Sequence, residues 1–203
     1  METLLTKDLI RLANDLVSNN KNLEGFVPGE GSLNPKFVLI SEAPGAKEAE
    51  LSHGFQGVSG KELDKWLNFI NVSRKDIYLT GTVRSRPFKQ KNGRKSDRKP
   101  NVKEIKDFSP LLDYELKCLK DKLLVTLGGT AINRLLGKDY KISKCHGILY
   151  NKPILFLKEN HFEFTDYSCN ILPLFHPSYV RRFPGKRDLV IKDLKYLKEL
   201  LGN

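Results

Sequence analysis

The sequence predicts an α/β protein with three layers, in which helices cover both faces of a central, mostly parallel four-stranded sheet. Four short runs of apolar residues are typical of buried parallel strands. Segments with helical periodicity lie between them, and this alternation favours a parallel sheet with helices on either side. The four expected strands are Phe37–Ile40, Ile77–Val83, Leu123–Leu127 and Asn170–Phe175.

Helices and loops are expected between these strands. Ser59 and Thr130 are candidate N-caps, because a hydroxyl oxygen can accept a hydrogen bond from an amide of the first helical turn. The expected helices are Leu5–Ser18, Gly60–Ile70, Val102–Lys120, Ala131–Leu136 and Asp188–Leu201. We expect loops over Gly25–Pro35, over Ser41–Gly60 and in the basic stretch after Val83, and a small hairpin over Ile148–Leu157 that turns at Asn151–Pro153.

Length and charge indicate one domain with a polyanionic partner. A chain of 203 residues suits a single domain over residues 1–203. Its formal net charge is +11, which favours nucleic acid because cationic side chains displace counterions from phosphates. A lysine-rich surface without such a partner is the alternative. The stretch Arg84–Lys103 concentrates Lys and Arg around a single acid, Asp97, and this local excess favours nucleic acid.

Other features argue against a membrane protein and a metal site. No apolar run approaches the roughly 20 residues that a membrane helix needs, and the N-terminal stretch lacks the apolar core of a signal peptide. We therefore expect a cytoplasmic protein without membrane contact. Cys118, Cys145 and Cys169 are scattered, so neither a disulfide framework nor a zinc site is expected.

Polar residues and glycines gather where two expected strands end. The loop after Ile40 contains two acids, Glu42 and Glu48, an aromatic residue, Phe55, and several glycines that allow a ligand to approach the backbone. His176 follows the last strand directly. Ligands of open parallel sheets bind beyond the carboxyl ends of the strands, so this edge is the candidate site.

The residues at the strand ends form four motifs in a fixed order. They are Glu42-Ala43-Pro44-Gly45 with Glu48, Phe55-x-Gly57-x-x-Gly60, Leu127-Gly128-Gly129-Thr130-Ala131, and His176-Pro177-Ser178-Tyr179 with Arg181. In this order they resemble the uracil-DNA glycosylase superfamily, most closely its family-4 type, which carries an iron–sulfur cluster. The resemblance extends from about Val27 to the C-terminus and implies the fold of that superfamily.

The resemblance implies roles for individual residues. His176 would donate a hydrogen bond to the base oxygen that gains charge, and Glu42 would orient water. Glu48, the third catalytic candidate, would line the same pocket. Base contacts would come from Ala43, Phe55, Gly81 and Thr80. DNA contacts would come from Arg84, Arg86, Ser178, Tyr179, Val180, Arg181 and Arg182, with Tyr179 and Val180 as the wedge and the arginines on phosphates.

Two departures from the family pattern are informative. The four cluster cysteines would lie in the N-terminal segment (two), at Ser85 and near Phe108, and this chain has none of them. Without thiolates we expect no cluster, no other cofactor and no metal, with the basic stretch and first helix held by packing. Gly81 stands where the family usually has an Asn that reads the uracil edge, so Thr80, Thr82 or the backbone of Gly81 would take that role.

The sequence therefore predicts a monofunctional DNA glycosylase that removes uracil, or a related deaminated base, from DNA as a monomer. One alternative is a paralogue that binds DNA or protein without catalysis, and Gly81 is the feature that favours it. Another is a glycosylase for a different lesion, such as hypoxanthine.

Overall fold

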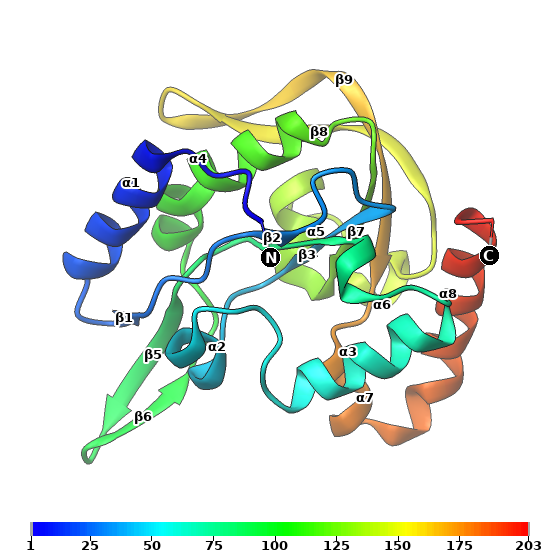
Figure 1. The fold of residues 1–203 in the computed structure, drawn as a ribbon, viewed down its shortest axis with the longest axis horizontal. Coiled ribbons are helices and arrows are strands. Elements are labelled where there is room, and N and C mark those ends of the chain that lie inside the picture. Colours follow the sequence, from blue (N-terminus) through cyan, green and yellow to red (C-terminus); the bar gives the residue numbers. More distant parts are fainter. Residues whose placement is uncertain (1, 203) are drawn as a thin grey trace.

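A six-stranded sheet forms the centre of the molecule in the computed structural model, which describes residues 2–202 (Figure 1). Met1 and Asn203, the ends of the predicted domain, lie outside the described residues. Across the sheet the strands are β2 (Glu30–Gly31), β4 (Tyr78–Gly81), β3 (Phe37–Ser41), β7 (Leu123–Leu127), β9 (His161–Leu174) and β8 (Tyr150–Lys158). The four inner strands are parallel, and the two edge strands are antiparallel to them. The predicted fold class is confirmed, with an unexpected edge strand, β2, and with β8 where we expected a small separate hairpin.

Both faces of the sheet are buried, which explains why its inner strands are continuously apolar. On one face, Phe37 and Leu39 of β3 join a core that includes Leu63 and Leu67 of α3 and residues of α8. On the other face, the alternate residues Val38 and Ile40 join a core with side chains of α4 and α5. This arrangement is the predicted three-layer packing.

The five predicted helices are confirmed in outline. The helices are α1 (Lys7–Ser18), α2 (Ala46–Leu51), α3 (Val58–Phe69), α4 (Val102–Cys118), α5 (Gly128–Leu136), α6 (Ile142–Cys145), α7 (Pro177–Arg182) and α8 (Arg187–Leu200). Of these, α2, α6 and α7 were not predicted. Helix α2 lies inside the segment 41–60 that we expected to be loop. Both predicted N-caps are wrong, because Gly57 precedes α3 and Leu127 precedes α5. Every helix within residues 2–202 is too short or too polar to cross a membrane.

Two hairpins differ from the prediction. The basic stretch contains β5 (Arg86–Lys91) and β6 (Arg94–Asp97), a hairpin that projects from the body and pairs with β1 (Leu23–Glu24) in a second, three-stranded sheet (Figure 1). The other hairpin, β8–β9, does not turn at Asn151–Pro153. Its strands pair up to Lys158 and His161, so the turn lies at residues 159–160.

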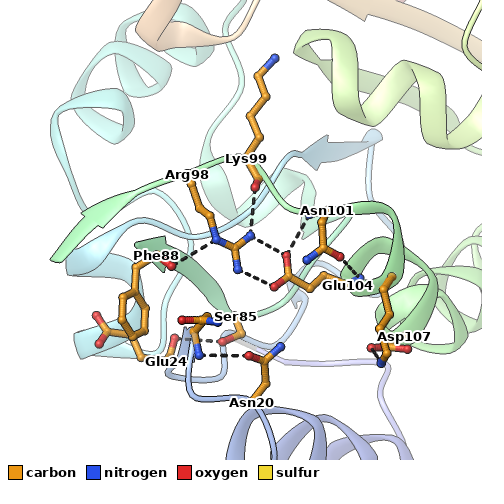
Figure 2. Close-up of polar contacts among 11 residues, drawn as sticks. Asn20, Glu24, Ser85, Phe88, Arg98, Lys99, Asn101, Glu104 and Asp107 are labelled. Carbon is orange, nitrogen blue, oxygen red and sulfur yellow. Dashed lines mark hydrogen bonds and ion pairs between the residues drawn. The ribbon is translucent and has the colours of Figure 1, made fainter. Parts of the chain in front are cut away.

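Polar contacts link the N-terminal region, the β5–β6 hairpin and α4 at the place where the resemblance puts the iron–sulfur cluster (Figure 2). Arg98 donates to both carboxylate oxygens of Glu104, at 2.6 and 2.7 Å, and the Ser85 hydroxyl donates to the Glu24 carbonyl. Phe108 packs with Leu5 and Ala13 of the first helix region. Hydroxyl, carboxylate and aromatic groups do not supply the thiolates that a cluster needs, so these residues do not fit one. Ion pairs thus supplement the packing that we expected here.

Candidate active site

A cavity of about 840 Å³ opens at the carboxyl ends of β3, β4, β7 and β9. Residues from both ends of the chain line it. Of the predicted site residues, the lining includes Glu42, Ala43, Glu48, Phe55, Thr80, Gly81, Arg84, His176, Ser178, Tyr179, Arg181 and Arg182. The acidic loop after β3 and the histidine after β9 therefore share one cavity, as the sequence predicts.

His176 is held as a neutral hydrogen-bond donor. It is the N-cap of α7, and its Nδ1 accepts a hydrogen bond from the Ser178 amide at 3.2 Å and lies 2.9 Å from the Ser178 hydroxyl. Burial, together with nearby Arg182, lowers the pKa of His176 to about 4 against the opposing effect of Glu48. With Nδ1 as acceptor in a neutral ring, the proton is on Nε2, which is the nitrogen free to donate.

Glu42 is oriented by a residue of another motif. The hydroxyl of Thr130, on α5, donates to Oε2 of Glu42. This contact joins the loop after β3 to the helix that follows β7, and it leaves Oε1 of the carboxylate without a protein donor among the hydrogen bonds of the described residues. Glu42 is partly exposed, so its second oxygen can hold a water molecule at the cavity wall.

Phe55 is fixed in a strained backbone conformation beside His176. Its φ is +54°, a value that non-glycine residues rarely adopt. The residue is 8% exposed, and its ring centroid lies 6.1 Å from that of His176. Arg74 holds the loop by donating to the carbonyls of Gly54 and Phe55, at 3.1 and 2.8 Å. Buried Glu30 accepts from the Gly54 amide at 2.9 Å. The loop thus presents Phe55 at a set position.

Glu48 supports the same loop rather than facing the cavity with a free carboxylate. One oxygen accepts from the Gly57 amide at 2.8 Å, and the other accepts from the Gly45 amide at 3.2 Å. These bonds span the two ends of the glycine-rich segment. Both oxygens of Glu48, which we predicted to be catalytic, therefore hold this loop, and this favours a positioning role.

Thr80 does not present its hydroxyl to the cavity. The hydroxyl donates to Oε2 of Glu115 at 2.6 Å, within a buried group that also contains Tyr78 and Arg84. Thr82 donates to the Ser41 carbonyl at 2.9 Å and is fully buried. Neither threonine hydroxyl can take the base-reading role that we considered for it.

Comparisons with known proteins agree with this geometry. The family model of the uracil DNA glycosylase superfamily matches residues 28–201. The chain belongs to the uracil DNA glycosylase superfamily. Among its relatives are proteins named type-4 uracil-DNA glycosylase. That of Saccharolobus solfataricus is 28% identical over 87% of this chain and 76% of its own length. That of Pyrobaculum aerophilum is 28% identical over 86% and 83%, and that of Thermotoga maritima is 27% identical over 89% and 85%.

Three residues that we predicted to contact DNA are buried in the structure. Arg84 is 2% exposed and pairs with buried Glu115, and Arg86 is 8% exposed and pairs with Glu24 and Asp97. Their guanidinium groups pair with carboxylates of the protein, which disfavours the predicted phosphate contacts of both. Val180 is 2% exposed in the core and cannot act as a wedge in this position.

The other residues that we predicted to contact DNA remain accessible at the cavity mouth. Arg181 and Arg182 are exposed, and Tyr179 is partly exposed with its ring stacked on Phe175 at 4.3 Å between centroids. Phe183, which follows α7, is 52% exposed and contacts Tyr179. The surface available to DNA on this side is therefore α7 and the residue after it.

Sequence reasoning missed Thr130, Arg74 and Ser41 as parts of the site. Thr130 was considered only as a helix cap, although its place in the third motif was a signal. Arg74 lies outside every motif and reaches Phe55 only through the fold, so no local signal could have identified it. Ser41 precedes the first motif and was considered only as the start of a loop, yet it lines the cavity.

Proposed function

We propose that this protein is a DNA glycosylase that hydrolyses the N-glycosidic bond of uracil in DNA. The observation that carries the proposal is the single cavity that Glu42, Phe55 and His176 share at the carboxyl edge of the sheet. The relatives named type-4 uracil-DNA glycosylase support the choice of substrate.

The reaction needs a flipped nucleotide, because the bond is inaccessible within a base stack. The ring of Phe55 would stack on the uracil, which is worth roughly 1–3 kcal/mol. As the bond breaks, negative charge grows on a base oxygen and positive charge on the sugar. The Nε2–H of His176 would donate to that oxygen, and a neutral imidazole with a lowered pKa suits this role because it keeps the proton.

Glu42 would stabilise the sugar cation and orient the attacking water with the carboxylate oxygen that Thr130 does not occupy. The products would be free uracil and an intact strand with an abasic site, as for a monofunctional glycosylase. Strand cleavage without alkali would contradict this point.

The DNA strand would run across the cavity mouth, where Lys47, Lys61, Lys99, Arg181 and Arg182 line the opening. The net charge of +11 supports a polyanionic partner. Action as a monomer and a cytoplasmic location stay predictions.

The test uses single-stranded oligonucleotides with one uracil, incubated with the wild type, Glu42→Ala or His176→Ala and then cleaved by alkali at abasic sites. We expect the wild type to release uracil and each variant to lose at least 100-fold in single-turnover rate, the usual scale for removing such a group. The exposed, distant Lys195→Ala is the matched control. Wild-type rates in both cavity variants would contradict the proposal, and tight binding without release would identify a non-catalytic binder.

A further inference from the structure

Three hydroxyl-bearing residues lie at the ends of β3 and β4, and two of them, Thr80 and Thr82, are buried. Thr80 donates to Glu115, and Thr82 is fully buried against the Ser41 carbonyl. Ser41, the last residue of β3, is partly exposed and lines the cavity. Its hydroxyl donates to the Thr80 carbonyl at 3.2 Å. With the proton committed there, the oxygen offers its lone pairs to a ligand.

The absent side chain at Gly81 keeps this oxygen uncovered. Ser41 and Gly81 are partners in the parallel register of β3 and β4. A Cβ at position 81 would lie 3.1 Å from the Ser41 Oγ and 3.3 Å from the Val83 carbonyl oxygen. A side chain at position 81 would therefore crowd the Ser41 oxygen, and the glycine avoids this.

A hydrogen-bond acceptor at this point distinguishes deaminated bases from their parents. The ring nitrogen beside the amino group of cytosine or adenine carries a lone pair and no hydrogen. Deamination converts this nitrogen to an N–H, at N3 of uracil and at N1 of hypoxanthine. An acceptor oxygen pairs with the N–H and is repelled by the lone pair, unless the hydroxyl rotates and gives up its bond to Thr80.

We infer that Ser41 is a specificity-determining residue that accepts a hydrogen bond from the ring N–H created by deamination. The cavity therefore takes deaminated bases as a class, hypoxanthine as well as uracil. The inference rests on the proposed function for its substrate, but it concerns binding discrimination and can be tested without catalysis.

The experiment measures competition binding by fluorescence anisotropy with single-stranded oligonucleotides that carry uracil, cytosine, hypoxanthine or adenine at one position. We expect the wild type to bind uracil about tenfold more tightly than cytosine, and hypoxanthine about tenfold more tightly than adenine, the value of one hydrogen bond. Ser41→Ala and Ser41→Gly should lose both ratios. The exposed Ser168 on β9 offers the control Ser168→Ala, which should keep them.

Equal wild-type binding of all four oligonucleotides would overturn the inference, as would wild-type ratios in both Ser41 variants. Thermal unfolding of each variant checks that the fold is intact. If the wild type discriminates as expected but releases no base, the proposed function fails while the role of Ser41 stands.

Discussion

Basic residues of two regions behave differently, although both were expected to contact DNA. In and beside the β5–β6 hairpin, Arg84, Arg86 and Arg98 all pair with carboxylates of the protein. At the cavity mouth, α7 exposes Arg181, for which the described residues show no ion pair. The comparison shows that local density of positive charge does not locate a nucleic-acid surface by itself. Arginines that pair with internal carboxylates are not free to bind phosphates, whereas Arg181 and the exposed Arg94 of the hairpin show no ion pair among the described residues.

The largest expected effect comes from breaking the most buried pair. Glu115→Ala would leave Arg84 buried without a counter-charge and remove the acceptor of Tyr78 and Thr80. We expect a loss of about 3–5 kcal/mol in unfolding free energy, measured by denaturant titration. Lys158→Ala, in an exposed pair with Glu163, should change it by less than about 1 kcal/mol. Similar losses in the two variants would show that Arg84 is not committed internally.

A smaller effect is expected at Arg98, whose partner Glu104 is 2% exposed. Burial raises the pKa of Glu104, but hydrogen bonds from Arg98 and the Asn101 amide outweigh it, so the pKa lies below its usual 4.5. The pairing therefore stabilises the fold above about pH 4.5 and is lost as the pH falls through the lowered pKa.

We expect Arg98→Gln to lower unfolding free energy by about 1–3 kcal/mol at pH 7 and to flatten its decline below pH 4.5. The exposed Lys103–Asp107 pair provides the control Lys103→Gln. An unchanged pH dependence in Arg98→Gln would refute the assignment.

The smallest effect on stability, and a clear one on binding, is expected at Arg181. Arg181→Ala should leave the unfolding temperature unchanged and weaken binding of single-stranded DNA. The slope of log affinity against log salt concentration should become shallower by about 0.7 if one phosphate contact is lost. Lys195→Ala, on α8, should keep the wild-type slope. A wild-type slope for Arg181→Ala would remove α7 from the DNA surface.

Apolar pattern and motif order were sufficient to predict the central layers and the shared cavity. Each inner strand is buried on both faces, so its sequence is a nearly continuous apolar run, as in Leu123–Leu127. The β5–β6 hairpin has no such run because most of its side chains are exposed. Its turn does carry a signal that we missed, since Asn92-Gly93 is a dipeptide typical of tight hairpins and both residues have positive φ.

Other features depend on contacts between residues far apart in the sequence, and no local sequence pattern predicts them. Pro153 suggested a turn, but it lies in β8, an edge strand where a missing amide is tolerated. The pairing of Arg84 with Glu115 joins residues 31 positions apart. The exposure of the Ser41 oxygen depends on the neighbouring strand. Such pairings decide which predicted site residues are free, and only the fold reveals them.

The most direct test of the account is mass spectrometry of a single-turnover reaction between excess protein and a single-stranded oligonucleotide that contains uracil. For the wild type we predict free uracil and an equal amount of intact abasic strand. For Glu42→Gln and His176→Gln we predict binding with little release. Wild-type protein that binds this strand and leaves the uracil attached would contradict the claim that the shared cavity breaks the glycosidic bond.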